Sequence, residues 1–136
     1  MILVAVLMSS CGISLENTGL QFISRYITLP SNAQNMHTYF QSIGRYGAAL
    51  AYFELDRQQT DDFLKSTCFL GFDDFNNEYS GSRIRNQPQQ GLPSWWNVSD
   101  VVFVQEGGCD SNGESWSIGI AEGDSVYKIY LVLVIQ

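Results

Sequence analysis

The sequence predicts an α+β fold, in which an antiparallel sheet of about five to six strands carries one main helix packed on one face. Three observations lead to this class. Strand-like segments precede a single clear helix at residues 56–67, three more follow it, and the last, residues 126–135, is almost wholly apolar. Strands grouped before and after one helix favour an antiparallel sheet over alternating βαβ units.

The chain of 136 residues suits one domain, and its 45% hydrophobic residues are sufficient for a packed core. We assign residues 1–10 to a signal-peptide-like segment and residues 11–20 to a tether. Residues 21–136 then form a single α+β domain.

Three strands are expected before the helix. Residues 21–29 (QFISRYITL) are rich in aromatic and β-branched side chains and end at Pro30, which is typical of a strand. Residues 36–43 (MHTYFQSI) fit either a helical stripe or a strand. We favour a strand because residues 48–55 (AALAYFEL) follow after a short turn, so that the two segments can form a hairpin.

The helix itself has a recognisable start. Asp56 can accept a hydrogen bond from the first turn, and Gln59 has the spacing of a capping box. Phe63 and Leu64 place apolar side chains on one side of the helix.

A long polar stretch at residues 71–94 follows and is expected to be irregular. Three strands are then predicted, with a glycine-rich turn at residues 107–113 and another turn at residues 122–124: residues 101–105, 115–121 and 126–135. The continuous apolar character of the last strand predicts a central place in the sheet.

The amino terminus begins with eight apolar residues, and the last of them, Met8, opens the sequence Met8-Ser9-Ser10-Cys11. This order resembles the lipobox of bacterial lipoproteins, in which small residues precede a cysteine that receives a diacylglycerol. The resemblance implies lipid attachment at Cys11, a membrane anchor with palmitate, and a place in the bacterial cell envelope facing the periplasm or the exterior. Two features depart from the pattern, since no Lys or Arg precedes the apolar run and the run is short. The alternative is a strand at residues 2–7 with Cys11 as an ordinary buried residue.

A second resemblance covers the central part of the chain. A strand ending in Phe53-Glu54-Leu55 precedes a helix containing Phe63-Leu64, and Trp95-Trp96 stands before three carboxy-terminal strands. This layout resembles that of uncharacterised bacterial envelope proteins. It implies a fold and a location, but no activity.

If Cys11 carries lipid, Cys68 and Cys109 remain as the other two cysteines. An even number of thiols in an oxidising compartment favours one disulfide, Cys68–Cys109. The alternative is two free thiols. Neither cysteine has a CxxC partner, so we expect no zinc or redox site.

Charge limits the range of partners. Seven Lys and Arg stand against 14 Asp and Glu, giving a formal net charge of −7. A surface of this sign repels phosphate backbones and anionic lipid, so we expect no nucleic-acid partner and no membrane attachment other than the lipid anchor.

Catalytic and cofactor signals are weak. His37 is the only histidine, and no serine or cysteine stands in a nucleophile motif. The acidic stretch at residues 73–78 lacks the glycine and the alternating order of a calcium loop, and no phosphate-binding loop is present. We therefore expect no catalytic residue, metal or cofactor. Trp95, Trp96, Phe75 and Tyr79 are the candidate binding residues.

The two tryptophans have two interpretations. In one, a single ring anchors the core while the other stays exposed to stack on a sugar or protein partner. In the other, which we favour, both rings pin the long loop to the sheet. The favoured function is a membrane-anchored, non-catalytic binding or accessory module with a protein or glycan partner. The alternatives are an acidic immunity-type protein that neutralises a toxin and a small hydrolase built on His37 with two carboxylates.

Overall fold

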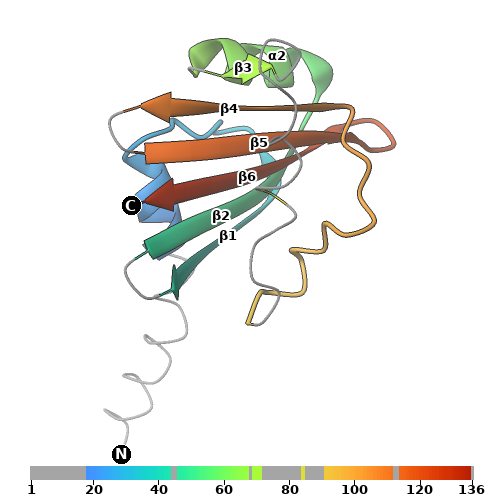
Figure 1. The fold of residues 1–136 in the computed structure, drawn as a ribbon. Coiled ribbons are helices and arrows are strands. Elements are labelled where there is room, and N and C mark those ends of the chain that lie inside the picture. The colour runs from blue at the N-terminus through green and yellow to red at the C-terminus, as the bar shows by residue number, and fades with distance from the viewer. Residues whose placement is uncertain are drawn as a thin grey trace, which may run out of the picture.

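The computed structural model describes residues 18–43, 46–67, 69–71, 84, 91–111 and 114–135. These residues form one antiparallel sheet with helices on one face, which confirms the predicted α+β class (Figure 1). The sheet contains six strands in the order β1-β2-β6-β5-β4-β3. The strands are β1 (Gln34–Ile43), β2 (Tyr46–Leu55), β3 (Leu70–Gly71), β4 (Gln105–Ser111), β5 (Glu114–Glu122) and β6 (Tyr127–Ile135).

The pairing of the strands follows the sequence pattern closely. β1 and β2 form the expected hairpin, and β4, β5 and β6 form the expected meander. β6 lies between β2 and β5, so its apolar run is central, as predicted. Side chains alternate between faces along each strand, so β1, β2, β5 and β6 each contribute side chains to two cores, one on each face of the sheet.

Helix α2 (Arg57–Ser66) begins as the sequence predicts. The Asp56 side chain accepts a hydrogen bond from the backbone N–H of Gln59 at 2.7 Å, and Gln59 Oε1 accepts one from the backbone N–H of Asp56 at 3.0 Å. This reciprocal pair satisfies two backbone donors that the helix cannot pair internally. Phe63 is buried and packs the inner face of α2 against the sheet.

The strand predicted at residues 21–29 is wrong. Residues 18–24 are helical, and the backbone N–H of Ile27 donates to the carbonyl of Ile23. Ile23 and Ile27, four residues apart, are both buried in the core. The burial of this helical pair outweighs the local strand preference of β-branched residues. The packed region also includes Gly19, which the sequence places in the tether.

The strand predicted at residues 101–105 and the turn at residues 107–113 are also displaced. Residues 101–103 have no regular secondary structure, and β4 runs through Gly107 and Gly108, which suggest a turn in the sequence. A Cβ on Gly108 would lie 2.5 Å from the carbonyl oxygen of Trp116 on β5. Gly108 therefore permits a close approach of two strands, a role of strand glycines that looks like a turn signal in the sequence.

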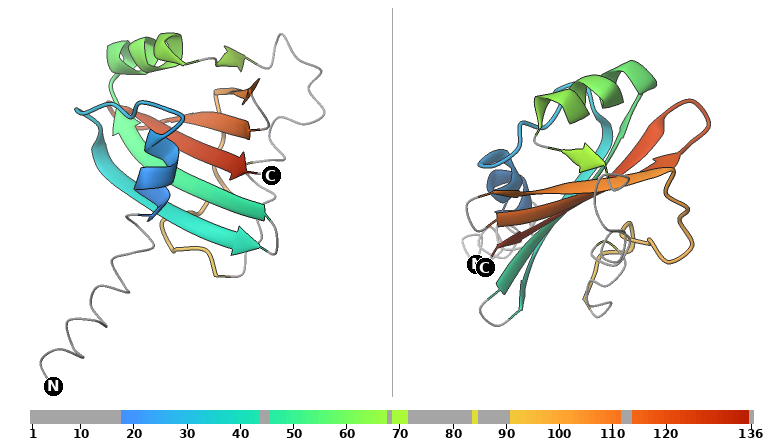
Figure 2. Two further views of the ribbon diagram at one scale, coloured as in Figure 1. Left: turned by 90° about the vertical axis from the view of Figure 1, so that its left-hand side faces the viewer. Right: turned by 45° about the horizontal axis from the view of Figure 1, so that its top comes forward.

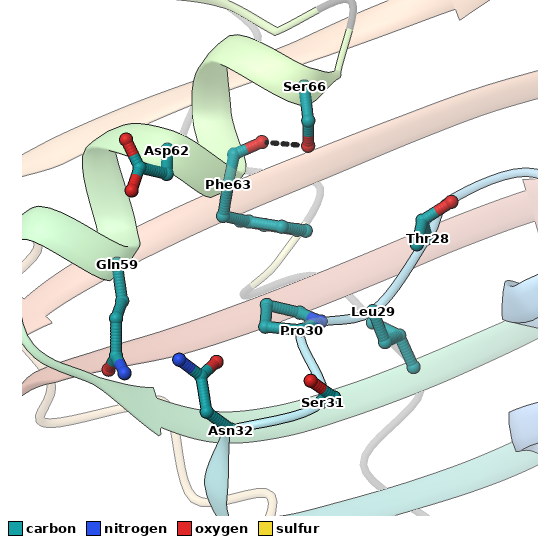
Figure 3. Close-up of a pocket in the computed structure, with 9 residues that line it drawn as sticks. All are labelled: Thr28, Leu29, Pro30, Ser31, Asn32, Gln59, Asp62, Phe63 and Ser66. Atoms are coloured by element: carbon teal, nitrogen blue, oxygen red, sulfur yellow. Dashed lines mark hydrogen bonds between the residues drawn. The ribbon is translucent and has the colours of Figure 1, made fainter.

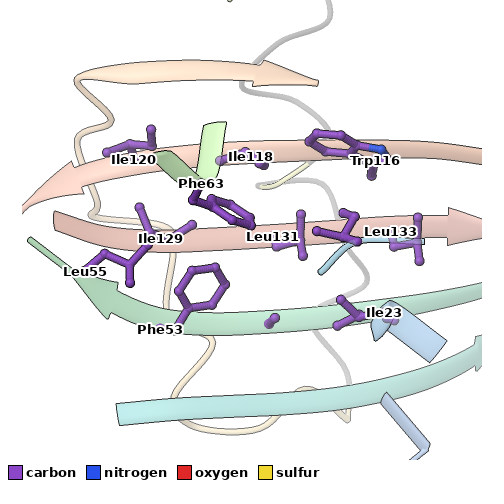
Figure 4. Packing of buried hydrophobic residues seen from close by; sticks show 13 residues of the cluster. Ile23, Phe53, Leu55, Phe63, Trp116, Ile118, Ile120, Ile129, Leu131 and Leu133 are labelled. Atoms are coloured by element: carbon purple, nitrogen blue, oxygen red, sulfur yellow. The ribbon is translucent and has the colours of Figure 1, made fainter. Parts of the chain in front are cut away.

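Two hydrophobic cores lie on the two faces of the sheet. The first, which we call the helix side, is covered by residues 18–24 and α2 (Figures 2 and 4). The second, which we call the loop side, is covered by segment 91–104 and by Ile84. Among the described residues the helix-side core is the larger. It contains Ile23, Ile27, Trp116 and aliphatic residues of β2, β5 and β6 around Phe53 and Phe63, whose rings meet edge to face at 5.5 Å. The loop side contains most of the aromatic contacts and the candidate site.

Candidate binding site on the loop side of the sheet

Strand register places two rows of side chains across the loop side. His37 on β1 faces Tyr52 on β2, which faces Tyr130 on β6, and Tyr130 faces Gly119 on β5. We call His37, Tyr52 and Tyr130 the aromatic row. Two residues after Tyr52 and on the same face of β2, Glu54 faces Lys128 on β6. We call Glu54 and Lys128 the polar row.

The aromatic row is held together by ring contacts. His37 and Tyr52 lie 6.3 Å apart between ring centroids, and Tyr52 meets Tyr130 edge to face at 5.1 Å. Edge-to-face and offset arrangements are the favoured geometries of aromatic pairs, because the ring edge is positive and the face negative. The row is therefore a fixed surface rather than a set of independent side chains.

Segment 91–104 adds two tryptophans to this row. Trp96 is buried and meets Tyr130 at 5.7 Å, whereas Trp95 is half-buried and stacks on His37 at 5.4 Å with an interplanar angle of 22°. The two indoles meet each other edge to face at 6.0 Å. Trp96 thus anchors the segment to the sheet, while Trp95 keeps part of its ring exposed beside the exposed His37.

The polar row is organised around Glu54. Its carboxylate accepts one hydrogen bond from the Tyr52 hydroxyl at 2.7 Å and another from the Asn35 amide at 2.9 Å. Asn35 has a left-handed backbone, with φ of 51°, at the register irregularity between Gln34 and His37. Asn tolerates this conformation better than most residues, so the irregularity supplies the second donor to the carboxylate.

The tyrosines of the aromatic row are held in their neutral form. Burial raises the pKa of Tyr52 above its ordinary range, and the hydrogen bond to Glu54 and the charge of that carboxylate raise it further. Burial, and then the Glu54 charge, raise the pKa of Tyr130. Both phenols therefore remain hydrogen-bond donors near pH 7, and neither is primed to act as a base.

A pocket of about 400 Å³ lies at the β6 end of these rows. Tyr130 and Lys128 connect it to the aromatic and polar rows. We call it the valine pocket, and its lining is Asp100, Val101, Val102, Val104, Ala121, Glu122, Lys128 and Tyr130.

The helix side carries a second pocket of about 360 Å³, between residues 28–32 and α2 (Figure 3). The amides of Asn32 and Gln59 point toward one another across it. Its polar groups already hold α2 together, because Gln59 completes the capping box, Asp62 accepts from Gln58, and Ser66 donates to the carbonyl of Phe63. We therefore place the candidate site on the loop side.

The predicted site residues have different outcomes. Trp95 and Trp96 lie in the site described above. Phe75, Tyr79, Cys11 and Cys68 lie outside the described residues. Cys109 is on β4, in a part of the strand whose side chains are not described. The proposed disulfide therefore stays a prediction.

His37 lies among aromatic rings on the loop side of the sheet. Its ring contacts in the described part of the chain are with Trp95 and Tyr52, and it lines neither of the pockets given above. Within the described residues, no group of three or more His, Cys, Asp or Glu side chains could hold a metal ion.

Sequence reasoning missed Tyr52, Tyr130, Glu54, Asn35 and Lys128 as members of the site. The period-two alternation places Tyr52 and Glu54 on one face of β2, and that signal was available. Their neighbours on β1 and β6 follow only from the register.

Comparison with known proteins gives no further guide, since no family model, curated protein or solved structure matches the chain. Among the described residues, no helix is long and apolar enough to cross a membrane.

Proposed function

We propose that this protein is a non-catalytic binding module of the bacterial cell envelope, anchored to a membrane by lipid on Cys11, which binds its partner on the loop side of the sheet. The observation that carries the binding proposal is the position of Trp95. Its ring is fixed between exposed His37 and buried Trp96, yet part of it is exposed.

A fixed, partly exposed aromatic ring suits binding. Ordering a flexible side chain on association costs about 0.5–1.5 kcal/mol, and a ring already held in place avoids this loss. Aromatic side chains also contribute a large share of the binding energy at protein and sugar interfaces. The Glu54 carboxylate and the Asn35 amide add polar groups at fixed positions next to Tyr52, which belongs to the same aromatic row as His37.

The absence of catalysis is part of the proposal. It is supported by the aromatic contacts of His37 and by the raised pKa values of Tyr52 and Tyr130, which keep both phenols protonated. A hydrolase of the Ser-His-Asp or carboxylate-pair type needs a base beside its nucleophile or water.

Lipid attachment is tested by labelling. Cells producing the full chain are given radiolabelled palmitate, and membrane and soluble fractions are separated. Wild type is expected to take up label and to fractionate with membranes, and Cys11→Ala to lose both properties. Cys109→Ala serves as the matched cysteine control and should behave as wild type. Unchanged labelling and fractionation in Cys11→Ala would end the anchor proposal.

Partner binding is tested by photocrosslinking in the same cells. A photoreactive phenylalanine derivative replaces Ser94, which is exposed next to Trp95, or Ser24, which is exposed in the helical segment on the other face. Adducts identified by mass spectrometry are expected at position 94 and not at position 24. They should disappear when Trp95→Ala is added. Equal adducts at both positions, or none at position 94, would contradict binding at the loop side.

An immunity-type function is the second candidate, favoured by three exposed carboxylates, Asp56, Asp61 and Asp62, at helix α2. Such a surface speeds association with a basic toxin. Co-expression with the product of a neighbouring toxin gene tests it. Protection that falls in Asp61→Lys/Asp62→Lys and not in Trp95→Ala would favour this function over the first.

A further inference from the structure

Two valines are unusually exposed beside the candidate site. Val102 is 79% exposed and Val104 is 55% exposed, whereas Leu20 and Tyr26, which are also exposed, reach only 39% and 40%. Val101 and Phe103, which alternate with them, pack into the loop-side core. Burial alternates along residues 101–104, so one side of the segment faces the core and the other presents both valines to solvent.

The valines lie at a concave site. Both line the valine pocket of about 400 Å³, together with Val101, Ala121 and Tyr130. An exposed pair of aliphatic side chains at the mouth of a partly apolar pocket is the arrangement that accepts an apolar anchor side chain.

The charges around the pocket are mostly negative. Asp100 and Glu122 are exposed and line it, and exposed Asp124 lies in the turn that follows Glu122. Lys128 is half-buried, and its aliphatic Cε would lie 3.4 Å from a Cβ on Gly123. Two exposed carboxylates and one half-buried cation therefore line the pocket, so that its charged groups are net negative beside an apolar centre.

We propose that the valine pocket binds a segment of a partner protein that presents an aliphatic or aromatic side chain next to a Lys or Arg. This inference rests on the proposed binding function and names the class of partner. The apolar side chain enters the pocket between Val102 and Val104, and the basic side chain pairs with Asp100 or Glu122.

Other occupants fit this surface less well. Sugars stack on aromatic faces, and valines offer none. Anionic lipid headgroups meet carboxylates at the rim. A second copy of this chain brings a net charge of −7 to the contact, so that like charges oppose association.

The test uses the purified full chain, solubilised in detergent and immobilised through a carboxy-terminal tag, to select from a phage-displayed library of random peptides. Selected peptides are expected to share an apolar residue within one or two positions of Lys or Arg. Their affinities are then measured by fluorescence anisotropy at low and high salt. Weaker binding at high salt is expected because the charged contacts lie at the exposed rim.

Peptide affinities of three double variants test whether the valine pocket is the binding site. Val102→Ser/Val104→Ser should weaken binding by ~10-fold or more, the loss of a central apolar contact. Leu20→Ser/Tyr26→Ser removes exposed apolar side chains outside the valine pocket and should change affinity by less than ~2-fold. Asp100→Asn/Glu122→Gln should weaken binding and reduce its salt dependence. Circular dichroism spectra matching wild type establish that each variant is folded.

Two results would overturn the inference: a selection that yields no such peptides, or peptide binding that Val102→Ser/Val104→Ser leaves unchanged. The crosslinking experiment at Ser94 is independent of both. If adducts form at Ser94 while the valine variants bind peptides as wild type does, binding at Trp95 stands and the valine pocket is not the site. If adducts are glycans alone, the proposed partner class is wrong.

Discussion

Phe103 occupies the space that Gly119 leaves open on β5. A Cβ built on Gly119 would lie 2.6 Å from Cε1 of the Phe103 ring and 2.8 Å from Cδ1 of Ile84. Gly119 faces Tyr130 across the β5–β6 pair, and Phe103 packs on Tyr130 edge to face at 5.6 Å. Because Gly119 has no side chain, Phe103 can pack against the sheet there, and with it segment 91–104, which carries the two tryptophans of the candidate site.

Gly119→Ala should displace Phe103 and loosen segment 91–104. We expect the free energy of unfolding to fall by about 1–3 kcal/mol, the range of overpacking substitutions, as measured by urea denaturation. Tryptophan fluorescence should change as well, because Trp95 and Trp96 belong to the same segment.

A double-mutant cycle controls for indirect effects. Phe103→Leu alone removes ring contacts and should lower the free energy of unfolding. In the double variant with Gly119→Ala, the smaller side chain should relieve part of the clash. The loss of unfolding free energy in the double variant should therefore be smaller than the sum of the two single losses. Strict additivity would show that the two residues do not interact in this way.

Gly19 is a second position where a glycine allows close packing, here between the helical residues 18–24 and β1. A Cβ at Gly19 would lie 2.8 Å from the backbone carbonyl carbon of Tyr39, and backbone cannot move aside as a side chain can. We expect Gly19→Ala to destabilise the fold by about 2 kcal/mol, although alanine is the better helix former. Ser24→Ala, at an exposed position of the same helical segment, should be neutral or slightly stabilising. A stabilised Gly19→Ala would mean that helix 18–24 does not pack against Tyr39.

The two tryptophans should differ in their contribution to stability. Trp96 is 3% exposed, and Trp96→Ala should cost about 3–5 kcal/mol. Trp95 is only half-buried, so Trp95→Ala should cost less than half as much. Urea denaturation followed by circular dichroism measures both losses. Equal losses would show that Trp95 is as much a core residue as Trp96, and would weaken its assignment as the binding residue.

Stability should fall at alkaline pH because of Tyr52. Its pKa is raised in the folded protein, so the folded state keeps this proton at a pH where the unfolded chain loses it. The contribution is complete below the unfolded pKa of about 10 and is lost as pH rises above that value. The measurement is the free energy of unfolding between about pH 8 and 11. Tyr52→Phe should lose stability less steeply over this interval, with Tyr130 accounting for part of the remaining slope. Parallel curves for the two proteins would contradict this assignment.

Cys68 and Cys109 should be bridged if the protein is exported. A bridge would close a loop of roughly 40 residues and restrict the unfolded chain. Thiol titration of the exported protein under denaturant is expected to find no free thiol before reduction and two after it. Two free thiols before reduction would reject the bridge and weaken the argument for an oxidising compartment.

The sequence by itself determined the elements that depend on local interactions. Helix α2 was predictable because both partners of its capping box, Asp56 and Gln59, lie within one turn. The central place of β6 followed from its almost wholly apolar run, since a strand covered on both faces presents few polar side chains. Trp95 and Trp96 could also be singled out from the sequence as candidates by residue type alone, although their contacts with His37 and Tyr130 could not.

Tertiary structure alone decided how these parts meet. The local sequence of residues 21–29 predicts a strand. In the structure a helix continues to residue 24 and a turn follows, which buries both Ile23 and Ile27 in the core. Gly108 predicts a turn from the sequence, but in the structure it lies in a strand, where the backbone of Trp116 on the neighbouring strand leaves no room for a side chain. The stack of His37 on Trp95 joins residues 58 positions apart in the sequence, and it depends on strand register and on the course of segment 91–104. Long-range contacts of this kind are selected by the packing of the whole chain, so no local pattern of residues could specify them.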